Sequence, residues 1–153
     1  MTDEKNISNK DLILYRFKDS IDKLKSAIDL MQNGDYKDSV GRSYYAIFTA
    51  ARALLATRQL DSSKHSGVIS IFNKNFVKEG IVPKEMSALI ENAKHYRERA
   101  DYGDFFIVSR EKCEEQIRQS KIFILEMSKG IAKEYPGIKN EIDKILETYF
   151  AKL

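Results

Sequence analysis

The chain is poor in the residues that build disulfide-linked or metal-bound domains. Its 153 residues include one cysteine, two histidines, two prolines and no tryptophan. With Cys113 alone, an internal disulfide, a CxxC redox motif and a cysteine-based zinc site are all excluded. The polar start at residues 1–6 does not resemble a secretory signal, and the apolar run at residues 46–56 is interrupted by Arg52. We therefore expect a cytoplasmic protein without a membrane span.

The common signatures of cofactor and metal chemistry are also missing. The sequence has no GxGxxG, GxxxxGK[ST], GxSxG or HExxH pattern, and its two histidines have no matched partners at metal-ligand spacing. We expect neither a cofactor nor a metal. The formal net charge of +3 is too small to indicate a polyanionic partner by itself.

Apolar residues recur at steps of three and four along almost the whole chain, which is the spacing of a helix face. Ser8 with Asp11 predicts the first helix start, Asp35 the second, and residues 61–63 the third. The predicted helices cover about residues 8–32, 36–56, 64–76, 84–102, 109–134 and 138–150, with breaks at 33–34 and 136–137. A single all-α domain over residues 1–153 follows, an antiparallel up-and-down helical bundle with short additional helices.

The second predicted helix carries an unusually wide apolar arc. Beside its main stripe lies a second one made of Tyr45, Phe48 and Leu55. Such an arc indicates a helix that is covered on more than one side, either in the centre of the bundle or shared with a partner. The second alternative predicts a homodimer whose interface draws on the second and fourth helices.

Residues 93–104 are the most informative stretch for function. A helix there places Arg97 and Asp101 one turn apart on one face, with Tyr102 beside them and an end at Gly103. One reading is a plain surface ion pair worth about 0.2 to 0.5 kcal/mol, in which an exposed Arg97 adds little to stability. A base followed by an acid opposes the helix dipole, however, which favours use in binding.

Three blocks of the sequence together resemble the HEPN domains, in particular their small stand-alone prokaryotic branch. These blocks are SYYAIFTAARALL at residues 43–55, SKHSGVI at 63–69, and RERADY at 97–102. The resemblance implies an all-helical homodimer that is paired with a minimal nucleotidyltransferase in a toxin–antitoxin or defence module. Many members are metal-independent RNases whose motif is an Arg followed after four to six residues by a His. Here Asp101 stands where that motif has its histidine.

The exchange of histidine for aspartate changes what the motif can do. RNA cleavage without a metal needs a group that accepts the 2′-hydroxyl proton, a group that protonates the leaving oxygen, and a cation near the phosphate. Asp101 beside Arg97 is a weak base and a poor acid, whereas Arg97 can still hold a phosphate. We therefore expect a dimeric module that binds a nucleotide, RNA or a nucleotidyltransferase. The alternatives are an active endoribonuclease using Arg97 with Asp101, His65 or both, and a helical adaptor that binds no anion.

The resemblance adds further candidates around Arg97. His65 near the start of the third helix is placed to contact an anion or to approach Arg97, and helix capping is an equally good role for it. We also expect Lys64, Tyr45 and Arg52 to contribute to binding. Tyr102 corresponds, one residue closer to the motif, to a tyrosine that the partner nucleotidyltransferase adenylylates in some relatives.

Two other residues match site patterns only superficially. Arg58 precedes His65 at the motif's spacing, but the pair spans a predicted loop, so we attribute the match to chance. His95 lacks a second histidine on its helix, and we place it outside the site.

Overall fold

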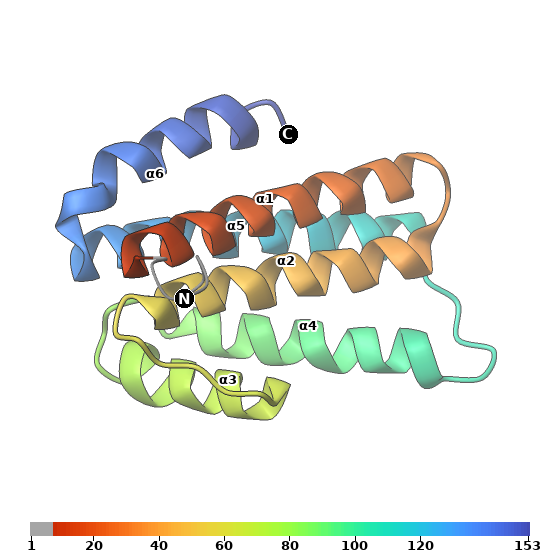
Figure 1. Ribbon diagram of the computed structural model, residues 1–153. Helices are drawn as coiled ribbons and strands as arrows, with labels where there is room; N and C mark the ends of the chain where they lie inside the picture. The colour runs from red at the N-terminus through yellow and green to blue at the C-terminus, as the bar shows by residue number, and fades with distance from the viewer. Residues whose placement is uncertain (1–7) are drawn as a thin grey trace, which may run out of the picture.

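The structure, a computed structural model, describes residues 8–153, and within them every regular element is helical. Four long helices lie alongside one another (Figure 1): α1 (Asn9–Gln32), α2 (Tyr36–Ala56), α4 (Glu85–Tyr102) and α5 (Arg110–Glu134). Two shorter helices flank this bundle, α3 (His65–Phe72) beside α4 and α6 (Lys139–Ile145) beside α1. The predicted all-α bundle is confirmed, while the polar start at residues 1–6 lies outside the described residues.

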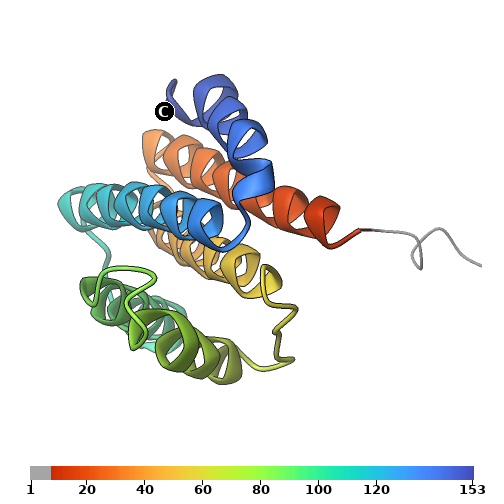
Figure 2. The same ribbon diagram turned by 90° about the vertical axis from the view of Figure 1, so that its left-hand side faces the viewer.

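Helix α2 is the centre of the bundle. It packs against α1, α5, α4 and α3, and 14 of its 21 residues are buried (Figure 2). Leu55 is fully buried, Phe48 is 7% exposed and Tyr45 is partly buried against the core, so most of the second stripe is covered within one chain. The first alternative, a helix central to the bundle, is therefore correct. The stripe is not a surface kept free for a second copy.

Small polar residues let the helices around α2 approach closely. The Ser39 hydroxyl donates to the Ala27 carbonyl of α1 at 2.6 Å and accepts from the Cys113 thiol of α5 at 2.9 Å. Ser120 of α5 donates to the Ser43 carbonyl at 3.1 Å. The hydroxyls of Ser39 and Ser120 thus each have a partner on a neighbouring helix, which offsets the cost of their burial.

Most helix ends follow the predicted local signals. The Ser8 hydroxyl accepts the N–H of Asp11 at 3.1 Å, and Ser109 accepts the N–H of Lys112 at the same distance. Gly34, at φ +84°, makes the left-handed turn between α1 and α2. Asp35 precedes α2 as predicted, but its side chain makes no capping hydrogen bond.

The start of α3 corrects the sequence prediction. The helix begins at His65, with Lys64 at the N-cap position, and the Ser62 hydroxyl accepts the N–H of Lys64 at 3.3 Å. The Asp61 carboxylate instead accepts hydrogen bonds from Arg52, at 2.8 and 3.2 Å, and from Arg16, at 3.0 Å. Burial raises the pKa of Asp61, but the Arg52 and Ser62 N–H bonds and the two guanidinium charges outweigh it and lower the pKa to about 2. This ion pair fixes the loop that delivers His65.

Two helical segments continue beyond their α-helical parts. α3 runs into a π-helical turn, Asn73–Val77, which completes the helix predicted to residue 76. After Glu134 the chain forms a 3-10 turn at Pro136–Ile138, then α6, then a π-helical turn at Leu146–Phe150, in agreement with the predicted terminal helix. None of the helices in residues 8–153 is both long and apolar enough to cross a bilayer.

Candidate functional site

The side chain of Arg97 extends from α4 toward α2, where its guanidinium lies over the ring of Tyr45. Its guanidinium carbon is 5.1 Å from the centre of the Tyr45 ring, and its Nη2 donates a hydrogen bond to the Tyr45 hydroxyl at 3.2 Å. Only 19% of the Arg97 side chain is exposed, so the expectation of an exposed arginine is wrong. Tyr45 holds the guanidinium in place through both contacts.

Asp101 forms the predicted one-turn ion pair with Arg97. Its Oδ2 lies 2.8 Å from the arginine Nε, and its side chain is 36% exposed. This contact is an ion pair without a hydrogen bond, since the buried Nε has no hydrogen-bond partner in the described part of the chain. Nη1 likewise makes no hydrogen bond to residues 8–153. Arg97 is therefore oriented by Tyr45 and Asp101, and its Nη1 remains available to a ligand.

A surface pocket of about 480 Å³ opens beside this arginine. Its wall combines Arg97, Asp101 and Tyr45 with residues from the first turns of α2, including Lys37 and Arg42. Our sequence analysis missed Lys37 and Arg42. Arg42 lies one turn and Lys37 two turns before Tyr45 on the same helix, and this spacing was the available signal. Three cations around one pocket favour an anionic ligand.

His65 also packs against the Tyr45 ring, edge to face. Its ring stacks on Phe48 with centroids 4.2 Å apart, meets the Tyr45 ring at 5.7 Å, and shares a hydrogen bond of 3.1 Å between Nδ1 and the Tyr44 hydroxyl. Burial, followed by the positive charges of Arg97, Lys94 and Arg52, lowers the pKa of His65. The imidazole is thus neutral near neutral pH and is well placed for proton transfer.

The structure gives Tyr44 a polar role that the sequence did not indicate. The residue is buried, and burial raises the pKa of its phenol, which therefore stays protonated. When this hydroxyl donates to Nδ1 of His65, the other ring nitrogen carries the proton. When Nδ1–H donates to the hydroxyl, Nε2 is a free proton acceptor.

The remaining predicted site residues lie at the margin of this arrangement. Tyr102 is 77% exposed at the end of α4, and Lys64 is exposed just before His65. Arg52 is held by Asp61, one turn of α2 beyond Phe48, and does not touch Arg97 within the described residues. Within residues 8–153 the structure therefore places Arg97 and His65 against Tyr45, with Asp101 paired to Arg97. A shared binding site of these residues stays a prediction.

The two residues set aside in the sequence analysis lie elsewhere. Arg58 donates to Glu134 at 2.6 Å and to the Asn75 carbonyl at 3.0 Å, so it ties α3 to α5 and does not pair with His65. His95 is exposed on another part of α4. In residues 8–153 no three His, Cys, Asp or Glu side chains converge as metal ligands would.

Comparison with known proteins relates the sequence to one family. The family described as HEPN domain matches residues 14–131. The chain is 36% identical over 108 residues to "Putative toxin MJ0605" of Methanocaldococcus jannaschii, covering 71% of this chain and 80% of that protein. It is 36% identical to a UPF0332 protein of Thermotoga maritima, covering 67% of this chain and 77% of that protein. A second M. jannaschii protein, "Putative toxin MJ0142", is 31% identical, covering 76% of this chain and 80% of that protein.

Proposed function

The chain belongs to the HEPN domain family, and on that premise we propose that it is a toxin-like module whose Arg97 site binds the phosphodiester backbone of RNA. The observation that carries the proposal is the state of Arg97. Its guanidinium is fixed against Tyr45, has donors to spare, and lies in a pocket with Lys37 and Arg42. Two relatives are named as toxins, which supports the toxin-like role.

Phosphate fits this site for reasons of geometry and charge. An arginine presents its donors in a planar fork that matches two phosphate oxygens, and a fork that is already oriented loses little side-chain entropy on binding. Asp38 and Asp101 in the same wall limit the net positive charge. A site of this kind holds one or two phosphates of a strand and does not attract polyanions indiscriminately.

Arg97→Ala tests the proposal directly. A charge-assisted contact is worth about 1.5 to 3 kcal/mol, so affinity for a labelled single-stranded RNA should fall roughly 10- to 100-fold in fluorescence anisotropy. Arg118→Ala, at an exposed position on α5, removes the same charge and is the control. Equal binding by the two variants would exclude Arg97 as the phosphate contact.

The second candidate function is metal-independent RNA cleavage, and the position of His65 favours it. Asp101 is a weak base at the position where the motif has its histidine. The neutral imidazole of His65, next to the Arg97 site, is a better proton acceptor. In this mechanism Nε2 of His65 accepts the 2′-hydroxyl proton as the 2′-oxygen attacks the phosphorus, and Arg97 stabilises the charge on the phosphorus centre. The bond from phosphorus to the 5′-oxygen then breaks, and the 5′-oxygen takes a proton from the His65 imidazolium or from water, which leaves a 2′,3′-cyclic phosphate. RNA incubated with the protein in EDTA should be cut, and His65→Asn should abolish the cleavage. Intact RNA with the wild-type protein would leave binding as the function.

We also propose that two copies associate through the connection between α4 and α5. Phe105 and Ile107 are 99% and 86% exposed there, and Phe105 is held at φ +61°, a conformation costly for a bulky residue. A second copy would remove both side chains from water. Sedimentation should give a dimer at tens of micromolar (on the order of ordinary assay concentrations), and Phe105→Glu should give a monomer. A wild-type monomer would contradict the proposal.

A minimal nucleotidyltransferase remains the proposed protein partner. Tyr102 offers a phenol that is 77% exposed, immediately after Asp101, so a modifying enzyme can reach it beside the RNA site. A nucleotide attached there would add negative charge near Arg97 and weaken RNA binding.

A further inference from the structure

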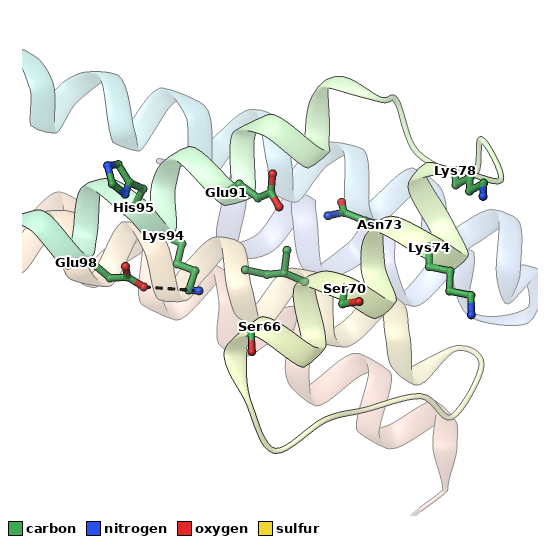
Figure 3. A pocket seen from close by; sticks show the side chains of 10 residues that line it. Ser66, Ser70, Asn73, Lys74, Lys78, Glu91, Lys94, His95 and Glu98 are labelled. Atoms are coloured by element: carbon green, nitrogen blue, oxygen red, sulfur yellow. Dashed lines mark ion pairs between the residues drawn. The ribbon is translucent and has the colours of Figure 1, made fainter.

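A second polar groove, of about 730 Å³, lies between α3 and α4 (Figure 3). From the α3 side it is lined by Ser66, Asn73, Lys74 and Lys78, where Asn73 opens the π-helical continuation of that helix. From the α4 side, Glu91 and Lys94 face it. None of these residues belongs to the pocket beside Arg97.

Positive charge is concentrated at the two ends of this groove. Lys74 and Lys78 project at one end, one turn apart, and neither forms an ion pair within residues 8–153 (Figure 3). At the other end Lys94 approaches Glu98 at 3.6 Å, a contact too long to occupy the ammonium group fully. Lysines without partners at the rim of a groove are suited to phosphate groups.

The middle of the groove offers hydrogen bonds in place of positive charge. The Oδ1 atom of Asn73 is buried without a hydrogen-bond partner in the described structure, an arrangement that costs about 1 to 3 kcal/mol unless a ligand or water supplies a donor. Glu91 faces Asn73 across the groove (Figure 3). A carboxylate repels phosphate but accepts hydrogen bonds from the amino and imino groups of a nucleobase.

We propose that this groove holds a segment of single-stranded RNA, with phosphates at the terminal lysines and one base between Asn73 and Glu91. The inference rests on the proposed RNA binding at Arg97 and extends it. His65 of that site and Ser66 of the groove are consecutive, and Lys94 lies one turn before Arg97 on α4. A strand bound at Arg97 therefore continues into the groove. Base edges are accessible in this way only in single strands, since a helical duplex buries them.

The charge arrangement is tested by a pair of matched double variants. Lys74→Gln with Lys78→Gln removes two charges from the groove, and Lys144→Gln with Lys152→Gln removes two exposed charges from the opposite end of the molecule, at α6 and beyond. Binding of an unstructured, labelled RNA of about a dozen nucleotides is titrated at several salt concentrations. The groove variant should lower the salt slope by about 1.4, and the affinity near 0.1 M salt roughly 10- to 30-fold. The control variant should bind like the wild type.

The base contact has its own test in Asn73→Ala. Affinity should fall about fivefold, the equivalent of one hydrogen bond, while the salt slope stays unchanged because no charge is lost. The thermal midpoint should not fall, since the amide oxygen has no partner in the free protein. Unchanged affinity would remove the base from this position.

The outcomes separate the groove from the Arg97 site. If the groove double variant binds like its control while Arg97→Ala binds weakly, the groove proposal is wrong and the Arg97 site stands. If Arg97→Ala binds like the wild type while the groove variant binds weakly, the groove stands and the proposed function of Arg97 fails. Wild-type affinity in both variants overturns both.

Discussion

The hydroxyl of Tyr45 is predicted to act on RNA only through Arg97, and Tyr45→Phe isolates this effect. The substitution keeps the ring under the guanidinium at 5.1 Å and removes the acceptor of the 3.2 Å hydrogen bond. A net hydrogen bond contributes about 0.5 to 1.5 kcal/mol, and partial solvent access places this one in the lower half of that range. We expect a two- to fivefold loss of RNA affinity. The salt slope should stay unchanged, because Arg97 keeps its charge.

Arg97→Ala removes more than the hydroxyl contact. It also removes the cation–π contact, worth about 0.5 to 1 kcal/mol, and the half-exposed ion pair with Asp101, worth about 0.3 to 0.5 kcal/mol. With the hydrogen bond at about 0.5 to 1 kcal/mol, the free energy of unfolding should fall by roughly 1.3 to 2.5 kcal/mol in total. Combining Arg97→Ala with Tyr45→Phe should add nothing further to the loss of affinity, since the hydroxyl has already lost its partner.

The double-mutant cycle is measured by anisotropy titration of a labelled RNA with the wild type, both single variants and the double variant. The expected coupling is about 0.5 to 1 kcal/mol, above the roughly 0.3 to 0.5 kcal/mol within which independent sites add. Tyr15→Phe, at a side chain that is 71% exposed, is the matched control. An equal loss from Tyr45→Phe with and without Arg97 would refute the reasoning, because Tyr45 would then contact the RNA itself.

Three further predictions concern the surroundings of the site. The pKa of His65 is lowered in the folded state, so its contribution to stability is complete above pH 6.5 and is lost as the pH falls through the pKa of the folded protein. In chemical denaturation, His65→Asn should not show this loss of stability at low pH. Asp61→Asn should lower the thermal midpoint at neutral pH by about 1 to 3 °C, a small effect because the carboxylate is partly exposed. The difference in midpoint between wild type and variant should shrink as the pH falls from 3.8 toward about 2, because the wild-type carboxylate takes up its proton in this range. Incubation with ATP and a minimal nucleotidyltransferase from a neighbouring gene should add the mass of a nucleotide to the peptide containing Tyr102, and the Tyr102→Phe variant should stay unmodified. An unmodified Tyr102 in the presence of an active enzyme would disprove its role as the modification site.

Local signals in the sequence were sufficient for the helices and for one half of the site. The hydroxyls of Ser8 and Ser109 begin helices because each caps an N–H only three residues away. Gly34 ends α1 because it takes a left-handed conformation without strain. Arg97 and Asp101 meet because residues four apart share a helix face. All of these interactions lie within one or two turns of the chain.

The other half of the site depends on contacts between distant segments, which only the packing of helices decides. Tyr45 and Arg97 are 52 positions apart and meet because α4 packs on α2. Tyr44 and His65 are 21 positions apart, and they meet because Asp61 is drawn to Arg52 instead of capping α3. An aspartate such as Asp61 can either cap a helix or pair with an arginine, so periodicity and propensity do not distinguish the two roles. The choice follows from the guanidinium groups that the folded bundle places beside the loop.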